Sequence, residues 1–598
     1  MARLTVAPAI VVLGAGALPV AERIRARYQG ATIHALAGRA EGDVAFSELG
    51  AHLRALYARG NPVVALCAAG IVIRCVAPCL ADKGVEPPVL AVAEDGSAVV
   101  PLLGGLTGVN LLAREIAETL GIAPAITTSG ELRFGACVLN PPEGYALADI
   151  GAGKRFVSDL LAGASTRVDG AAPWLEGVAL PVDAAGSHAI RVTPRRAGGA
   201  GSGELLIHPR SVVVALAEGF AHRAASLAAP AQAADAEAGG DPLARRILDA
   251  LAAADLSPLA LAALVAPRQC MREAALARAA RELGVPLRFV ASEADPADTA
   301  AALLDAALAA GSIDASPAIT LDDHGKPSKS LAIAIAEAPV DANRLGQARG
   351  SLTVLGLGPG RADLLAPAAR LALAEATDIL GYATYVRMAG PFRADQRVHE
   401  TDNREELQRA RHAFELAAQG RRVAMVSSGD PGVFAMAAAV LEALDGAGEP
   451  AWDEVALEVV PGVSAAFATA AEAGAPLGHD FCVISLSDNL KPWGVIEERL
   501  ALAARADLVM AFYNPISKAR PWQLDRALEI LREIRAADTV VVLGRDVGRP
   551  GASLRSLTLG ELRTADVDMR TMVIVGSSKT RRFASAEREW IYTPRFYD

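Results

Sequence analysis

Three glycine-containing turns are the residues of this chain whose types and spacing could do chemistry. They read LGLGPG at residues 355–360, SSGDPGVF at 427–434 and VVPGVSA at 459–465. Glycine has no Cβ, so such turns let backbone N–H and C=O groups approach a ligand closely. One turn of this kind also occurs in nucleotide-binding folds, so only the set of three, in this order, narrows the chemistry.

Each of these turns lies between a predicted strand and a predicted helix. The same alternation fills the rest of the chain: Ala9–Leu13 reads as a strand, Val20–Tyr28 as a helix and Gly108–Gly121 as a helix with apolar spacing near 3.6. Strands that alternate with helices indicate α/β layering. We therefore predict an α/β fold throughout.

Composition divides the chain into two parts. Only 9 aromatic residues lie in residues 1–350, whereas 17 lie in residues 351–598. The net charge of −10, with no basic tract, argues against a nucleic-acid partner. Six scattered cysteines suit neither a disulfide scaffold nor a metal set, so we predict no metal.

The apolar stretches of the sequence bear on whether the chain spans a membrane or carries a secretory signal. No apolar run approaches the roughly 20 residues that span a bilayer. The N-terminus has an early Arg and an apolar stretch, as a secretory signal has, but it also reads as an opening strand, turn and helix. We favour the second reading and expect a cytoplasmic protein.

The three turns, together with FYNPISKARPW, VVVLGRDVGRPG and GHDFCVISLSDNLKPW, resemble the tetrapyrrole methylase family of class III S-adenosylmethionine-dependent methyltransferases. The resemblance covers residues 351–598 and is greatest for the ring-contracting branch that methylates precorrin-3B at C-17 in cobalamin biosynthesis. It implies two αβα lobes, about 351–462 and 463–598, that hold S-adenosylmethionine between them. The absence of a basic face speaks against the family members that act on RNA.

Carried over residue by residue, the resemblance implies a cofactor pocket. It would be lined by Pro359, Ser428, Gly429, Asp430, Val433, Ser464, Ala465, Tyr513 and Asn514. Methyl transfer to an electron-rich macrocycle chiefly needs two aligned reactants, and alignment can supply about 7–11 kcal/mol. A glycine-rich cradle without a nucleophilic Ser or Cys is adequate for that.

Ring contraction additionally needs a group that takes a proton from a hydroxyl. His479, Asp480 and Asp430 are the candidates, since an imidazole or carboxylate can do this near neutral pH. The alternative is that His479 and Asp480 shape a turn before a strand. Arg545 is the best placed of several arginines to pair with a carboxylate of the macrocycle.

The N-terminal part, most clearly Gly70–Glu131, resembles the cobalt-precorrin-5A hydrolase family, which opens a lactone and releases acetaldehyde. Lys83 and Asn110 keep the pattern and are expected to bind a carboxylated corrinoid. A family His is replaced by Leu106, and a Gly-x-Gly-Cys turn by the residues at 215–218. We expect a hydrolase-like α/β module with reduced or absent hydrolysis; a bifunctional enzyme and a non-catalytic binding or dimerisation module are the alternatives.

The expected organisation follows from both resemblances. It comprises an α/β region at 1–150, an irregular Gly/Pro/Ala-rich connection at 151–240, a small α/β domain at 241–340 and the methylase domain at 351–598. We expect a small-molecule tetrapyrrole as substrate, a homodimer, and transient hand-over to other enzymes of the corrin pathway.

Overall fold

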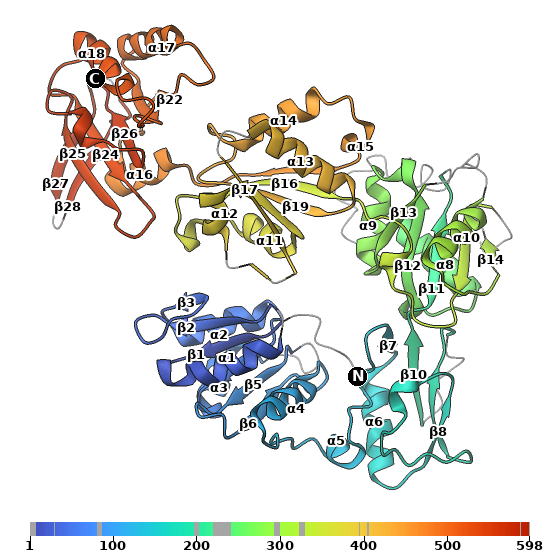
Figure 1. Ribbon diagram of the computed structural model, residues 1–598. Helices are drawn as coiled ribbons and strands as arrows, with labels where there is room; N and C mark the ends of the chain where they lie inside the picture. Colours follow the sequence, from blue (N-terminus) through green and yellow to red (C-terminus); the bar gives the residue numbers. More distant parts are fainter. Residues whose placement is uncertain are drawn as a thin grey trace. The chain divides into compact units, whose positions relative to one another are not determined.

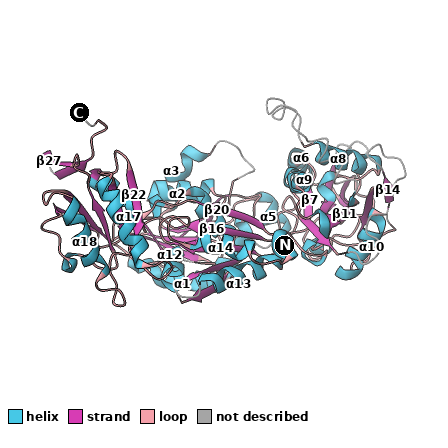
Figure 2. Ribbon diagram, turned by 90° about the horizontal axis from the view of Figure 1, so that it is seen from above, coloured by secondary structure: helices cyan, strands magenta, loops and turns pink. Residues whose placement is uncertain are grey.

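The computed structural model describes most of the chain, in two compact units. The described residues are 7–28, 30–80, 86–196, 203–218, 241–291, 299–317, 319–321, 329–390, 392–393, 395–402, 406–585 and 588–596. The N-terminal unit comprises Met1–Arg349 with Pro391–Asp395, and the C-terminal unit comprises Gly350–Gly390 with Gln396–Asp598. Helices and strands alternate in both units (Figure 1; Figure 2). No helix among the described residues is both long and apolar enough to span a bilayer.

The N-terminal unit begins with a six-stranded sheet of order β3-β2-β1-β4-β5-β6. Its strands are parallel except for β6, which runs antiparallel to β5. Helices α1 and α4 pack on one face and α2 and α3 on the other, since alternate strand residues join separate cores. The elements are β1 (Ala9–Val12), α1 (Leu18–Arg27), β2 (Thr32–Leu36), β3 (Val44–Phe46), α2 (Leu49–Ala58), β4 (Val63–Leu66), α3 (Ala69–Val76), β5 (Val89–Val92), β6 (Val99–Leu103) and α4 (Val109–Leu120).

A second, four-stranded sheet of order β7-β10-β9-β8 follows, where the sequence predicts an irregular connection. That prediction is wrong for the described residues between 151 and 216. The strands are only three to six residues long and are separated by Gly- and Pro-rich turns, so their periodicity is too brief to recognise. The elements are α5 (Ser129–Phe134), β7 (Tyr145–Leu147), α6 (Ile150–Leu161), β8 (Thr166–Asp169), η3 (Pro173–Leu175), β9 (His188–Val192) and β10 (Glu204–Pro209). Residues 219–240 lie outside the described residues.

The third sheet of the N-terminal unit has the order β13-β12-β11-β15-β14. Helices α8 and α9 cover one face and α10 covers the other. The elements are β11 (Val212–Leu216), α8 (Pro242–Ala253), β12 (Leu261–Pro267), α9 (Ala274–Leu283), β13 (Leu287–Val290), α10 (Ala300–Gly311), β14 (Ile319–Leu321) and β15 (Leu331–Ile335). The three sheets together confirm the predicted α/β class for this unit.

The first lobe of the C-terminal unit is built on a parallel sheet of order β18-β17-β19-β16-β20. Figure 1 shows α13 and α14 on one face and α11 and α12 on the other. Because all five strands are parallel, their carboxyl ends meet at one edge. The elements are β16 (Ser351–Gly356), α11 (Pro367–Glu375), β17 (Asp378–Tyr382), α12 (Ala383–Ala389), β18 (Arg397–Thr401), α13 (Glu406–Ala418), β19 (Arg422–Ser427), α14 (Met436–Asp445), α15 (Pro450–Asp453) and β20 (Ala456–Val460).

The second lobe is a mixed sheet of order β22-β23-β26-β24-β25. Helices α17 and α18 pack on one face, whereas α16 and a terminal hairpin pack on the other. The elements are α16 (Ala465–Ala473), β21 (Gly474–Ala475), β22 (Phe481–Ser485), α17 (Trp493–Arg505), β23 (Val509–Tyr513), α18 (Gln523–Ile534), β24 (Val540–Arg545), β25 (Ser553–Thr558), β26 (Thr571–Val575), β27 (Arg581–Ser585) and β28 (Arg588–Tyr592). Two lobes, each with helices on both faces of a sheet, are the predicted architecture.

Candidate active site

The three glycine turns meet at the carboxyl edge of the first-lobe sheet, because β19, β16 and β20 are neighbours. Gly358 and Gly429 exchange two backbone hydrogen bonds, with N···O distances of 3.1 and 2.8 Å. A Cβ on Gly356 would lie 2.3 Å from the Gly429 carbonyl oxygen, and one on Gly462 would lie 2.2 Å from it. Both positions therefore require glycine, since the backbones of the turns are in direct contact.

Asp430 connects the second turn to the third. Its Oδ1 accepts a hydrogen bond from Gly432 N at 2.8 Å, and its Oδ2 accepts one from Gly462 N at 3.0 Å. Bonds from backbone N–H groups to a carboxylate are charge-assisted and stronger than neutral ones. The carboxylate therefore fixes the relative position of two strands of the cradle.

Arg549 connects the cradle to the second lobe, from the loop between β24 and β25. Its Nε donates to the carbonyl oxygen of Pro359 at 3.0 Å, and its Nη2 donates to Ser428 Oγ at 3.0 Å. A Cβ on the neighbouring Gly548 would lie 2.8 Å from Pro359 Cγ. From the sequence, Arg549 is one of several arginines that could pair with a carboxylate of the macrocycle, and no spacing signal links it to residues more than a hundred positions away.

The third turn ends at the start of α16. Ser464 is buried and caps this helix, its Oγ accepting from Phe467 N at 3.4 Å. The Tyr513 hydroxyl accepts from Ala466 N at 3.2 Å, which brings the end of β23 to the same place. A Cβ on Gly429 would lie 3.6 Å from Ser464 Cα and 3.8 Å from Ala465 N.

Two further predicted residues lie beside these. Val433 N donates to the backbone oxygen of Asp430 at 3.3 Å, so it stays within the second turn. Asn514 has a positive φ of 52° directly after β23, and its Nδ2 donates to Ser485 Oγ at 3.1 Å. The structure thus brings the nine predicted cofactor residues around one group of turns.

His479 and Asp480 do not join this group. Both precede β22, where Asp480 N donates to His479 Nδ1 at 2.7 Å. Ser485, at the other end of that strand, is the residue that contacts Asn514. Five strand residues at about 3.3 Å each place the pair roughly 16 Å along β22 from Ser485. That they take a proton from the substrate stays a prediction, and the alternative is that they shape the turn before the strand.

Arg545 lies at the carboxyl end of β24 and is already paired. Its Nε is 2.8 Å from Asp568 Oδ2, and its Nη1 is 3.4 Å from the buried Asp546. Its side chain is nevertheless about two-fifths exposed. A carboxylate of a ligand would therefore compete with two acidic side chains for this guanidinium.

The residues present fit S-adenosylmethionine. Gly358, Gly360 and Gly429 have φ values of 69°, 132° and 70°, a conformation that other residues rarely adopt. A Cβ on Gly358 would lie 3.0 Å from the Leu364 carbonyl oxygen, and one on Gly360 would lie 2.8 Å from Arg549 Cγ, so a side chain has little room at either position. Among the described residues no group of three or more His, Cys, Asp or Glu side chains could hold a metal ion.

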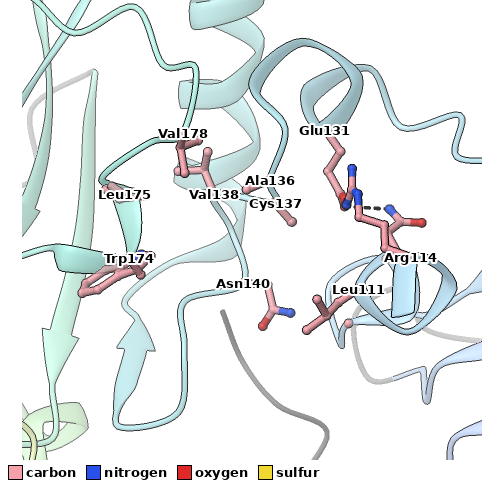
Figure 3. Close-up of a pocket in the computed structure, with 13 residues that line it drawn as sticks. Leu111, Arg114, Glu131, Ala136, Cys137, Val138, Asn140, Trp174, Leu175 and Val178 are labelled. Carbon is pink, nitrogen blue, oxygen red and sulfur yellow. Dashed lines mark hydrogen bonds and ion pairs between the residues drawn. The ribbon is translucent and has the colours of Figure 1, made fainter. Parts of the chain in front are cut away.

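The N-terminal unit holds a separate polar cluster. Asn110, only 4% exposed, donates through Nδ2 to Glu131 Oε1 at 2.6 Å and to Thr128 Oγ1 at 3.1 Å. Arg114 Nη1 lies 2.6 Å from Glu131 Oε2. Figure 3 shows Arg114 and Glu131 on one side of a pocket whose other side carries Trp174, Leu175 and Val178. Asn110 also lines this pocket.

The remaining N-terminal predictions have different outcomes. Lys83 lies outside the described residues. Ala215 and Leu216 are fully buried in β11, where they pair with Ala332 and Leu331 of β15. The residues at 215–216 therefore form the end of a core strand.

The C-terminal unit is thus a two-lobed α/β protein whose interlocked glycine turns form a cradle at the carboxyl edge of the first-lobe sheet. Residues 351–563 of this unit match the family model of tetrapyrrole (corrin/porphyrin) methylases. In the N-terminal unit, residues 51–131 match the cobalamin synthesis G N-terminal model. The chain belongs to the tetrapyrrole methylase family, whose members transfer a methyl group from S-adenosylmethionine.

Named relatives agree with this assignment. The precorrin-3B C(17)-methyltransferase of Sinorhizobium sp is 52% identical over 249 residues, which cover 42% of this chain and 97% of that protein. The cobalamin biosynthesis protein CobIJ of Mycobacterium bovis is 46% identical over 285 residues, 47% of this chain and 54% of that protein. The crystal structure of the methyltransferase CobJ has 52% identity and a TM-score of 0.39, and covers 41% of this chain and all of that one.

Proposed function

We propose that the C-terminal unit methylates precorrin-3B at C-17 and contracts the ring in cobalamin biosynthesis. The observation that carries this proposal is the 52% identity along nearly the whole length of a precorrin-3B C(17)-methyltransferase. The cradle supports it, because each glycine that the backbone contacts require is present.

In this proposal the cradle holds and orients S-adenosylmethionine, which supplies an electrophilic methyl group on its sulfonium. Pro359, Ser428 and Gly429 face the cofactor from the first two turns, with Asp430 and Val433 beside them. Ser464, Ala465, Tyr513 and Asn514 close the pocket from the third turn and from β23. Holding two reactants in line supplies about 7–11 kcal/mol, which is the main task of these residues.

Asp430 is the one proton-transfer candidate that lies at the cradle. Each of its oxygens already accepts from a backbone N–H group, so we assign it a positioning role between two turns. Arg545 remains our candidate for a contact with a carboxylate of the macrocycle. Its exposed face would bind the substrate while Asp568 holds its other side.

A second candidate function concerns the N-terminal unit. The match of residues 51–131 to the cobalamin synthesis G N-terminal family favours a second corrinoid site, with Asn110 and Lys83 as its binding residues. The strand at Ala215–Leu216 argues for binding without hydrolysis. Release of acetaldehyde from cobalt-precorrin-5A by the intact protein would instead establish a bifunctional enzyme.

We further propose that the protein works as a homodimer in the cytoplasm and passes its product to other enzymes of the corrin pathway. The test of the main proposal uses the intact protein with S-adenosylmethionine and precorrin-3B, and follows the product by mass. Gain of one methyl group with a contracted ring is the expected result. An unchanged substrate mass would contradict the proposal.

A further inference from the structure

The rim of the cradle carries two side chains, Phe434 and Lys491, that none of the proposed cofactor contacts uses. Phe434 is the last residue of the second turn, whereas Lys491 lies between β22 and α17, so they come from different lobes. Lys491 Nζ lies 5.8 Å from the centroid of the Phe434 ring, within cation–π range. The Tyr513 ring of the cradle lies 5.4 Å from the same ring. The two side chains therefore stand beside the cofactor pocket.

The conformation and exposure of Phe434 are both unfavourable for a merely structural residue. Its φ of 53° lies in the left-handed region that a bulky residue seldom adopts. Its side chain is 52% exposed, so the strained backbone buries little apolar surface in return. A ring kept in this way at the edge of a cofactor site is available to a ligand.

Lys491 brings an unneutralised charge to the same place. Among the described residues no carboxylate lies within ion-pair distance of its ammonium group. Burial, and next the positive charge of Arg499, lower the pKa of Lys491. An anionic group bound here would offset the repulsion and satisfy a partly desolvated ammonium.

We propose that Phe434 and Lys491 form a substrate clamp, in which the ring packs against the face of the conjugated macrocycle and the ammonium binds one of its side-chain carboxylates. The inference rests on the proposed function, since it takes a carboxylated tetrapyrrole as the ligand. In this inference Phe434 and Lys491 recognise the methyl acceptor, whereas the glycine turns bind the methyl donor, S-adenosylmethionine. Because the two residues belong to different lobes, the bound substrate also bridges the lobes.

The test measures the two KM values of the intact enzyme separately. Lys491→Met should raise the KM for precorrin-3B about tenfold through loss of a charge-assisted bond, and Lys491→Arg should recover most of it. Phe434→Leu should raise the same KM about threefold. The KM for S-adenosylmethionine should stay within about twofold in all three variants, as should its binding measured by calorimetry. Lys154→Met and Phe583→Leu, an exposed lysine and a 50% exposed phenylalanine elsewhere, are the matched controls.

Two different outcomes would overturn the inference. If Lys491→Met and Phe434→Leu behave like their controls, or raise the two KM values equally, the rim does not recognise the substrate although the wild-type enzyme methylates it. If the wild-type enzyme transfers no methyl group to precorrin-3B, the proposed function fails and the clamp fails with it. A variant that does not bind S-adenosylhomocysteine has lost the cradle, which also counts against a role confined to the substrate.

Discussion

The cradle of the C-terminal unit and the polar cluster of the N-terminal unit are built in opposite ways. In the cradle, backbone contacts backbone, and Gly356 and Gly462 leave no room for a Cβ. In the N-terminal cluster, side chains contact each other, as Asn110 and Arg114 do around the buried Glu131. A site made of backbone tolerates almost no substitution, so its motif can be recognised in the sequence. A network of side-chain contacts is harder to recognise in the sequence than a set of glycine turns.

A similar contrast appears within the N-terminal unit, at the end of β11. The end of β11 is a buried strand with Cβ atoms packed into the core, not an open glycine turn. Packing there is complete, and nothing in the backbone of this strand is left uncovered for a ligand. The cradle thus has positions where a Cβ cannot fit, whereas every position of β11 carries a buried side chain.

The largest effect should come from filling the cradle with one methyl group. We expect Gly462→Ala to lower methyl transfer and cofactor affinity more than a hundredfold, because its Cβ would meet the Gly429 oxygen at 2.2 Å and no flexible side chain can yield. Gly494→Ala is the control, since nothing lies within 4 Å of that position. Cofactor affinity is measured by calorimetry and methyl transfer by turnover. Equal values in the two variants would contradict the claim that the cradle excludes a Cβ at position 462.

Breaking the N-terminal cluster should affect stability and not methyl transfer. Glu131→Gln removes the charge that faces Arg114 in a group only 4% exposed, and we expect a loss of about 2–3 kcal/mol in the free energy of unfolding of this unit. Thermal unfolding measures it. Glu118→Gln, at an exposed pair with Arg27, should change little. A Glu131→Gln variant with lower methyltransferase activity but unchanged stability would contradict the claim that this cluster serves stability and not methyl transfer.

Loosening the connection between the lobes should have an intermediate effect. Arg549→Met loses the hydrogen bonds to Pro359 and Ser428, and we expect cofactor affinity to fall about tenfold. Arg555→Met is the matched control, because its partner is an acidic residue away from the turns. If both variants bind the cofactor with identical affinity, the hydrogen bonds of Arg549 do not stabilise the cradle.

The smallest effect is expected at His479. If it only shapes the turn before β22, His479→Ala should leave kcat for ring contraction within about twofold, as for a surface substitution. Asp430→Asn is the contrasting variant and should lower cofactor affinity about tenfold, since one amide then lacks its charged acceptor. A loss of contraction with methylation intact in His479→Ala would restore the histidine as a proton acceptor.

What the sequence could predict follows the same physical division. The glycine turns were recognisable because steric exclusion of a Cβ leaves few alternatives at each position. The α/β layering was equally clear where strands and helices were long, as in β16 and α4. The nine expected cofactor residues came from the resemblance to the methylase family, and the structure places them around one group of turns.

Other features could not be predicted because they depend on distant contacts. Arg549 meets Pro359 across 190 positions, and only the packing of the second lobe brings it there. The short strands β7 to β10 have too few residues to show a period. His479 lies within a recognisable motif, but the motif does not contain the strand direction, which places His479 at the end of β22 opposite Ser485.

The most direct test of the central claim is a single-turnover reaction of the intact protein. Precorrin-3B and S-adenosylmethionine carrying a labelled methyl group are mixed with wild-type protein and with Gly462→Ala, and the product is analysed by mass and by the position of the label. We expect the wild-type protein to place one labelled methyl group at C-17 and to contract the ring, and the variant to do neither. Label at another carbon, or no label in the wild-type product, would contradict the account.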